Sequence, residues 1–273
     1  MGGPEMAPHT PQRSEAPRHS RGAPRYPYRL LPLWFFLVTL ALWQIASRLD
    51  HPDFVLSPVE IASHFTEALR AGELLPHVVA SLVRSLPGFV IGSLVGVVLG
   101  LMAGIARSLD QLLSPVVFLT YPVPKIVFLP IVMLWVGIGD VSKILIIALA
   151  CFYPAFINAY YGAKATPRIL VWSARNMGAS DARIFRRVVL PAALPLIFAG
   201  LRVSLALSFI VMFATEMINA RSGLGHLIRD AENSLRFDLM YVSLLSIAIL
   251  GYLGDRLLRF AGGRLLSWHA EAA

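Results

Sequence analysis

The chain has 273 residues, of which 56% are hydrophobic and 15% charged, and its mean hydropathy is +0.66. This composition excludes an ordinary soluble globular protein and predicts an all-α chain that crosses a bilayer several times. We attribute the formal net charge of +8 to membrane topology and contact with anionic lipid. Nucleic acid is not an expected partner, because the stripe of aromatic and basic residues typical of single-strand binding is absent.

Six stretches are long and apolar enough to cross about 30 Å of hydrocarbon as helices. The first is expected to be a retained anchor rather than a signal peptide, because it lacks a small-residue cleavage pattern and further spans follow it. The proline-rich residues 1–29 are predicted to form a disordered tail. The six predicted spans are residues 30–47, 82–106, 114–136, 142–163, 192–217 and 239–260.

Charge sets the predicted orientation, because Lys and Arg accumulate in cytoplasmic loops. Residues 1–29 carry five arginines and residues 164–191 carry six basic residues, so both segments and both termini are expected in the cytoplasm. Residues 49–80 carry five acidic residues against Arg70, which suits the outer side. Residues 218–238 are the exception, because their arginines are matched by equally many acidic residues.

Motifs for catalysis are missing from the sequence. It contains no phosphate-binding GxxxxGK[ST] loop, no HExxH metal motif and no GxSxG nucleophile motif. Its one cysteine, Cys151, lies in an apolar span and rules out an internal disulfide. We therefore expect a membrane protein that is not an enzyme and that binds no metal or cofactor itself.

The basic segment 164–191 between the fourth and fifth spans is the most informative part of the chain. A first helix is predicted from Pro167, which suits a first helical turn, to Gly178, which suits the position just past a helix end. A second helix is predicted to open at Ser180 or the next residue and to run until Pro191 begins the fifth span.

This helix-turn-helix fits two functions. Its turn of small residues and the apolar anchors Trp172, Met177 and Ile184 suit a groove on a partner protein. Three arginines in the second helix suit an amphipathic helix on lipid headgroups equally well. Periodicity alone leaves both open. These arginines are Arg183, Arg186 and Arg187.

The segment resembles the EAA loop of the inner-membrane permease subunits of ABC importers. That pattern is Glu-Ala-Ala, three residues, Gly, nine residues and then Ile-x-Leu-Pro. Here Trp172, Ser173 and Ala174 precede Gly178, and residues 188–191 follow at the family spacing without a gap. The family's Glu is therefore Trp172, and its first Ala is Ser173.

The likeness covers about residues 55–268. It rests on LSPVEIASHFTEAL, SLVRSLPGFVIGSLVGVVLGLMAGIARSLD, YPVPKIVFLPIVMLWVGIGDVSKI, ATEMINARSGLGHLI and RLLSW. These stretches resemble the permease branch that imports nitrate, taurine, aliphatic sulfonates and related small solutes, including bicarbonate and a thiamine-precursor pyrimidine. A small anion is the expected solute, and an uncharged one is the alternative.

The resemblance implies the transmembrane domain of a type I ABC importer in the cytoplasmic (inner) membrane. Two permease chains, expected to be a homodimer, would form the path. Two cytoplasmic ATPase subunits would bind ATP and Mg, and a periplasmic or lipid-anchored solute-binding protein would deliver the solute. The coupling residues that it implies are Trp172, Ser173, Ala174, Asn176, Met177, Gly178, Ala179, Ser180, Leu190 and Pro191.

The resemblance also completes the predicted organisation of the chain. It comprises a disordered cytoplasmic tail (1–29), a first transmembrane helix with a periplasmic segment (30–77), an ABC type-1 transmembrane core with the coupling loop 164–191 (78–262) and a cytoplasmic tail (263–273).

Prolines in the third predicted span must kink or break its helix, because they lack the backbone N–H. Pro122 and Pro124 are therefore expected to face the path or a partner chain, where the freed carbonyls find partners, with a packing kink as the alternative. Lys125 follows near the middle of the span, where a charge costs at least about 2.5–3.5 kcal/mol unless it is paired or hydrated. It is expected either to attract an anionic solute or to cap those carbonyls.

The fifth span supplies the other candidate path residues. Arg202 could attract an anion or reach the cytoplasmic interface, and Ser208 follows on the same span. The resemblance suggests that the stretch around Glu216 meets the binding protein or forms an outer gate, with an exposed interfacial carboxylate as the alternative.

Small residues recur about every four positions in the second span and predict a helix face for close packing. They are Gly88, Gly92, Ser93, Gly96, Gly100 and Gly104.

Two other classes of protein remain as alternatives. An ion-coupled carrier would usually show acidic residues within its spans, and almost none occur here. A membrane scaffold or assembly factor would not need the EAA spacing.

Overall fold

The computed structural model describes residues 31–49 and 54–265, and within these ranges the regular structure is entirely helical. These residues fall into two units that divide within the first helix, between Trp43 and Gln44. The predicted tail of residues 1–29 lies outside the described residues. The helices are α1 (Leu31–Leu49), α2 (Pro58–Arg70), α3 (Leu74–Ile105), α4 (Arg107–Thr120), α5 (Leu129–Val136), α6 (Asp140–Lys164), α7 (Arg168–Asn176), α8 (Asp181–Ile184), α9 (Leu190–Asn219), α10 (Leu224–Asn233) and α11 (Phe237–Leu265).

Four of the described helices are long and apolar enough to cross a membrane: α3, α6, α11 and the continuous helix Asp181–Asn219. A fifth span results if α4 and the segment Lys125–Val136, which meet at 93°, are counted as one. In α1 the apolar part, Leu33–Leu49, is shorter. The six predicted spans are compatible with this arrangement, with α1 as the first.

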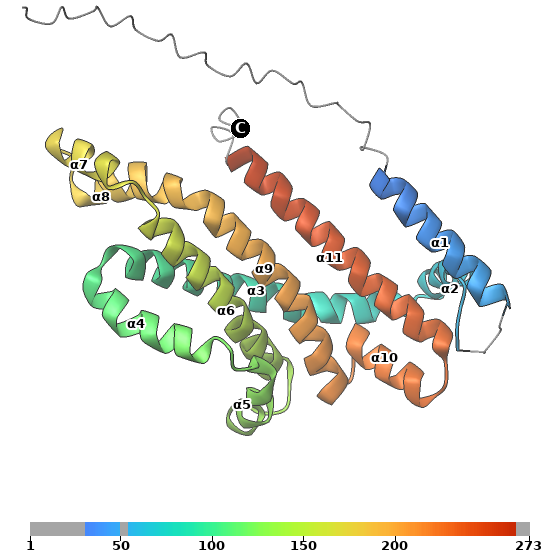
Figure 1. Ribbon diagram of the computed structural model, residues 1–273. Helices are drawn as coiled ribbons and strands as arrows, with labels where there is room; N and C mark the ends of the chain where they lie inside the picture. Colours follow the sequence, from blue (N-terminus) through green and yellow to red (C-terminus); the bar gives the residue numbers. More distant parts are fainter. Residues whose placement is uncertain (1–30, 50–53, 266–273) are drawn as a thin grey trace, which may run out of the picture. The chain divides into compact units, whose positions relative to one another are not determined.

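Helices α3, α6 and α9 pack together as the centre of the second unit (Figure 1). The small-residue face predicted on α3 lies against α6, as expected. A Cβ atom added at Gly96 would lie 2.5 Å from the carbonyl oxygen of Phe152, and one at Gly100 would overlap the carbonyl of Phe156. Glycine is therefore required here because the two backbones nearly touch.

Helix α3 begins at Leu74, earlier than the predicted second span. Leu74 is 1% exposed and belongs to a core cluster with Leu224 of α10 and Val242 of α11. The extra turns therefore form because they pack against protein, which a search for lipid-crossing stretches does not detect.

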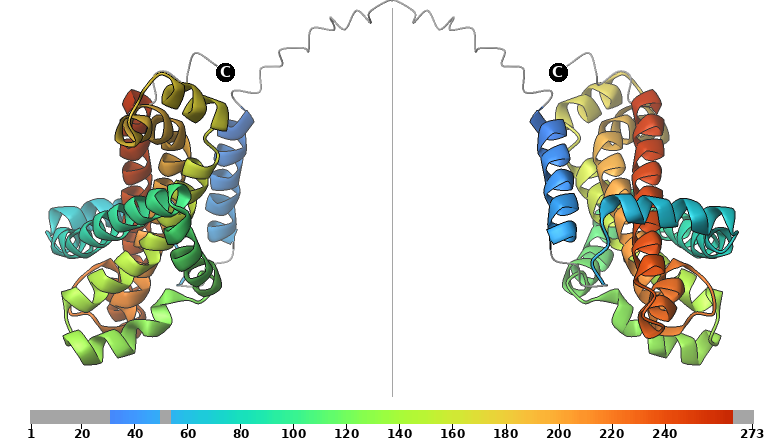
Figure 2. Two further views of the ribbon diagram at one scale, coloured as in Figure 1. Left: turned by 90° about the vertical axis from the view of Figure 1, so that its left-hand side faces the viewer. Right: turned by 90° about the vertical axis from the view of Figure 1, so that its right-hand side faces the viewer.

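Different helices lie at the two ends of α9. Helices α7 and α8 lie at one end of α6 and α9, and α10 lies at the other (Figure 1 and Figure 2). At the α10 end, Arg229 donates to the carbonyls of Met217 and Ile218 at 2.9 and 3.0 Å. This arginine caps the C-terminus of α9, which gives a local reason for a basic residue in a loop that we expected outside.

Candidate functional site

The segment between α6 and α9 folds as the predicted helix-turn-helix. Helix α7 begins after Pro167, as expected, and ends before Gly178, whose φ is +77°. The N–H of Gly178 donates to the carbonyl of Arg175 at 3.0 Å, and that of Ala179 donates to Ala174 at 3.0 Å. This pair of hydrogen bonds is a Schellman motif, in which the left-handed residue is most easily glycine.

The second helix of the segment starts where predicted but does not end there. Ser180 is the N-cap residue of α8, and the helix continues through a π-helical turn, Phe185–Val189, into α9. Pro191 lies in the first turn of α9, as expected, but no break separates α9 from the second helix. Pro191 lacks the N–H that an α-helix would bond, and the π turn that directly precedes it shifts the hydrogen-bond pattern without breaking the helix.

The exposed side of α7 carries two of the three predicted anchors. Trp172 is 58% exposed and Met177 is 80% exposed. Ile184 was wrongly expected among them, because it is 5% exposed and packs with Val189 and Ala193 in a cluster beneath the loop. The apolar outer surface of the loop is therefore confined to α7 and its turn.

The remaining predicted coupling residues divide between surface and core. Ser173, Asn176 and Ser180 are exposed. Half-buried residues hold the loop to the membrane helices through the same cluster as Ile184. They are Ala174, Ala179 and Leu190, with Pro191 half-buried beside them.

A polar contact fixes the end of α6 where this loop begins. Lys164 donates to a carboxylate oxygen of Asp110 in α4 at 2.7 Å, and the hydroxyl of Tyr160 donates to the same carboxylate at 2.8 Å. Ser114 donates to it as well, at 2.7 Å. The base of the loop is thus tied to α4 and α6 together.

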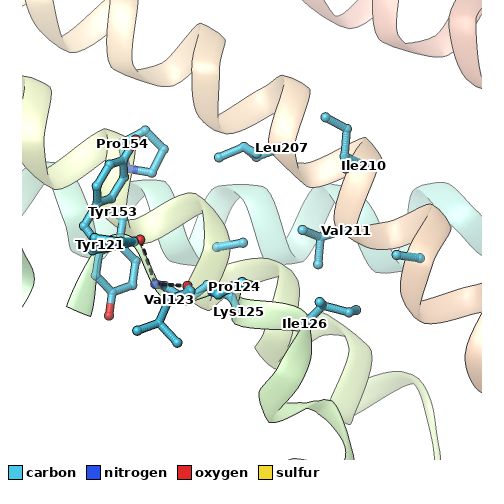
Figure 3. A pocket seen from close by; sticks show the side chains of 13 residues that line it. Tyr121, Val123, Pro124, Lys125, Ile126, Tyr153, Pro154, Leu207, Ile210 and Val211 are labelled. Carbon is cyan, nitrogen blue, oxygen red and sulfur yellow. Dashed lines mark hydrogen bonds between the residues drawn. The ribbon is translucent and has the colours of Figure 1, made fainter.

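The break in the third predicted span borders a cavity of about 350 Å³ (Figure 3). Helix α4 ends at Thr120, and a 3₁₀ segment, Lys125–Phe128, leads into α5. Pro122 and Pro124 lie in the turn between them and line the cavity, with Tyr153 of α6 and Leu207 of α9 opposite. The prolines therefore break the helix; a kink was the other outcome that their missing N–H groups allowed.

Lys125 is held at the wall of this cavity. Its ammonium group donates to the carbonyls of Thr120, Tyr121 and Val123 at 2.7, 3.2 and 2.6 Å. The same group lies 3.9 Å from the centroid of the Tyr153 ring, a cation–π contact. Figure 3 shows the ammonium turned toward the carbonyls of the turn. Within the described residues it has no carboxylate partner.

Arg202 and Ser208 lie elsewhere and do not line this cavity. Arg202 forms an ion pair with Asp255 of α11 at 2.7 Å, and its side chain is 50% exposed. Ser208 is buried and donates to the carbonyl of Leu205 in its own helix at 2.7 Å. The structure does not bring these two candidate path residues together with Lys125.

Glu216 is fully buried, so the exposed interfacial carboxylate expected as an alternative was wrong. Its carboxylate accepts a bond from Arg84 of α3 at 2.7 Å and from Ser81 at 3.1 and 2.8 Å. The backbone N–H of Gly225 in α10 donates to it at 3.0 Å. Four hydrogen bonds from three donor groups on two helices, α3 and α10, therefore compensate the charge that burial would otherwise disfavour.

Arg84 extends this network and was missed by the sequence reasoning. It donates to Asp140 at the start of α6 at 2.6 Å and to the carbonyl of Ser222 at 2.6 Å. A lone arginine within the second predicted span and a lone glutamate within the fifth were the available signal, because buried charges in membranes pair with one another.

Comparison with known protein families assigns the chain. Residues 96–266 match the model of the binding-protein-dependent transport system inner membrane component family. The chain belongs to this family. The matched residues include α6, the helix-turn-helix, α9 and α10, and the predicted membership of this permease family is confirmed. The coupling role of residues 164–191 stays a prediction.

Curated members of the family support the assignment over most of the chain. The putative aliphatic sulfonates transport permease SsuC of Escherichia coli (strain K12) is 39% identical over 225 residues, 81% of this chain and 86% of that protein. The riboflavin transport system permease RibX of Chloroflexus aurantiacus is 39% identical over 222 residues, 81% and 82% of the two chains. The E. coli taurine permease TauC is 32% identical over 247 residues, 89% and 87%.

Among solved structures, a chain of the inward-facing MetNI methionine ABC transporter matches with a TM-score of 0.52 and 24% identity. The match covers 71% of this chain and 92% of that one, and it shows the fold. Family membership confirms a multi-pass inner-membrane permease rather than a membrane enzyme. It also implies a separate ATPase and a solute-binding protein as partners.

Proposed function

We propose that this permease imports a small anionic solute of the sulfonate class and that an ATPase drives it through residues 164–191. The observation that carries the coupling assignment is the form of the loop. Trp172 and Met177 project from a short helix that a Schellman turn holds in place. Exposed large apolar side chains on an ordered turn are what a groove on a partner would bind.

The loop is also connected so that it can transmit movement. On one side α7 follows α6 after a short turn, and on the other α8 continues into α9 without a break. A partner that holds α7 differently in two states would therefore move both helices, because coupling needs contacts that differ between states. Since both helices line the cavity beside Lys125, its walls would move with them.

Lys125 supports an anionic solute. Arg202 pairs with Asp255, whereas the contacts of the Lys125 ammonium group within the described residues are backbone carbonyls and a ring. A cation without a counter-ion creates a positive potential in the adjoining cavity, which favours a negatively charged solute. Relatives named for aliphatic sulfonates and taurine are consistent with this class.

A second solute class has its own support. The riboflavin permease is as similar as the sulfonate permease, and the rings of Tyr121 and Tyr153 stand beside the cavity. Aromatic rings of this kind stack on flat heterocycles. An uncharged heterocyclic solute is therefore the alternative.

The assembly that follows contains two copies of this chain, two ATPase subunits and one solute-binding protein outside. Both termini and residues 164–191 lie on the cytoplasmic side, and α10 lies on the outer side. The charge distribution of the loops supports this orientation, and the capped position of Arg229 accounts for one arginine of the outer loop.

The coupling assignment is tested by Gly178→Asp. This substitution strains a left-handed backbone by about 1–2 kcal/mol and displaces α7. Gly72 provides a matched control, because its φ is +75° and, as at Gly178, an added Cβ would meet no atom within 4 Å. We expect ATP-dependent uptake to be lost in Gly178→Asp and kept in Gly72→Asp, with equal membrane insertion of both.

Removal of residues 170–180 provides the second arm. We expect the ATPase to co-purify with the full chain and to be lost from the deletion variant. Normal uptake by Gly178→Asp, or an ATPase that stays bound without residues 170–180, would refute the assignment of the loop.

A further inference from the structure

Three arginines on the first turns of the continuous helix Asp181–Asn219 lie outside the set of predicted coupling residues. Arg183, Arg186 and Arg187 are all exposed. With Ala182 they line a surface depression of about 500 Å³. No ion pair or side-chain hydrogen bond to any of the three occurs within residues 31–49 and 54–265, whereas nearby Arg175 pairs with Asp181.

Their spacing brings the three side chains to one site. Residues three and four positions apart are neighbours on a helix surface, and the depression that they share confirms this. Ile184 and Val189 of the same segment face the buried cluster beneath the loop. The segment therefore has an apolar side fixed to the protein and a basic side that no described residue covers.

The position of the arginines along the helix matches the phosphate layer of a bilayer. Residues 188–201 contain no charged residue, so the hydrocarbon-facing part of the helix begins near Leu190. At the α-helical rise of about 1.5 Å per residue, Arg187 would lie about 4.5 Å before Leu190 and Arg183 about 10 Å before it. The π turn Phe185–Val189 makes both separations shorter. The headgroup layer on each side of the hydrocarbon is about 5–8 Å thick.

We propose that Arg183, Arg186 and Arg187 bind the phosphate of an anionic phospholipid at the loop side of the membrane. Guanidinium groups bind phosphate oxygens through paired, charge-assisted hydrogen bonds. Three guanidinium groups without a partner among the described residues surround one depression and form such a site. The position of this site at the phosphate layer of the membrane selects a lipid over phosphate in free solution. The bound lipid anchors the start of α8 and α9 while α7 remains free to engage its partner.

The test measures lipid retention by the full-length purified chain. Protein stripped of lipid in neutral detergent is titrated with phosphatidylglycerol or phosphatidylcholine, and the bound lipid is counted by native mass spectrometry. We expect the wild-type chain to prefer phosphatidylglycerol, and R183Q/R186Q/R187Q to bind it at least about tenfold more weakly. A control with the same change in charge, R70Q/R221Q/R236Q, should bind it as the wild type does.

Three results would contradict the proposal. Equal phosphatidylglycerol binding by the triple variant and the wild type would overturn the site. Displacement of the lipid by an equal concentration of inorganic phosphate would show that membrane depth does not select the ligand, which overturns the lipid assignment. Loss of ATPase co-purification without any change in lipid binding would assign this face to the ATPase. If the triple variant does not fold, the single variant R186Q gives the same comparison.

Discussion

Replacement of Glu216 by alanine tests whether the buried charge network holds the α10 end of the permease together. The substitution leaves Arg84, whose side chain is 5% exposed, with Asp140 as its remaining carboxylate partner. It also removes the acceptor of the Ser81 hydroxyl and of the Gly225 N–H. Neither donor gains access to water, because Ser81 is fully buried and Gly225 is packed against α9.

The expected loss of stability is large. Breaking a buried ion pair by removing one partner costs about 3–5 kcal/mol, because the other charge stays buried. Asp140 keeps the loss near the lower end of that range, because it still accepts from the Nε of Arg84 at 2.6 Å. Glu216→Gln should cost less, since the amide oxygen can still accept one bond although the charge is gone.

The assay is SDS-induced unfolding of the purified permease in mixed micelles, followed by circular dichroism. Glu67→Ala is the matched control, because the Glu67 side chain is 69% exposed and its ion-pair partner among the described residues is His64. Arg84→Met combined with Glu216→Leu should be less destabilised than the sum of the two single variants, because no buried charge is left opposite a missing partner. The reasoning fails if Glu216→Ala unfolds as the wild type does, or if the two single effects are additive.

Three further outcomes are expected. Gly96→Ala should destabilise the permease by about 1–3 kcal/mol through overpacking, because the added Cβ atom would meet the α6 backbone. Gly263→Ala is the control and should leave stability unchanged, because its Cβ atom would meet no atom within 4 Å. SDS unfolding of both variants measures the difference. Lys125→Met should lower the initial rate of sulfonate uptake more than Lys125→Arg, which keeps the charge, and equal rates would remove Lys125 from the path. Arg202→Gln should leave uptake unchanged in the same assay, since its ion pair with Asp255 lies away from the cavity; impaired uptake would return Arg202 to the path.

Much of the architecture could be predicted because its signals are local. Apolar length located the membrane helices, and glycine spacing located the α3 face that meets α6. In the loop, Pro167 and Gly178 bounded α7 because proline and glycine act through their own backbone dihedrals. These features need no knowledge of tertiary contacts.

The errors all arose where tertiary contacts decide. The π turn at Phe185–Val189 keeps Ile184 and Val189 on the buried side, although in a regular α-helix residues five apart are separated by about 140°. An exposed carboxylate was one of two alternatives for Glu216. Its partner Arg84 lies far away in the sequence, and only the folded chain brings the two side chains to 2.7 Å. Pairing lone charges of opposite sign between spans would have found this contact.

Helix α6 connects the coupling loop to the candidate path. At one end Lys164 ties it to α4 where the loop begins, and farther along Tyr153 and Pro154 form a wall of the cavity. Tyr153 and Lys164 are separated by about 16 Å along the axis. Because the glycine face of α3 lies at backbone contact with α6, we expect the two helices to move together. A force applied at α7 should therefore reach the cavity through this pair of helices moving together.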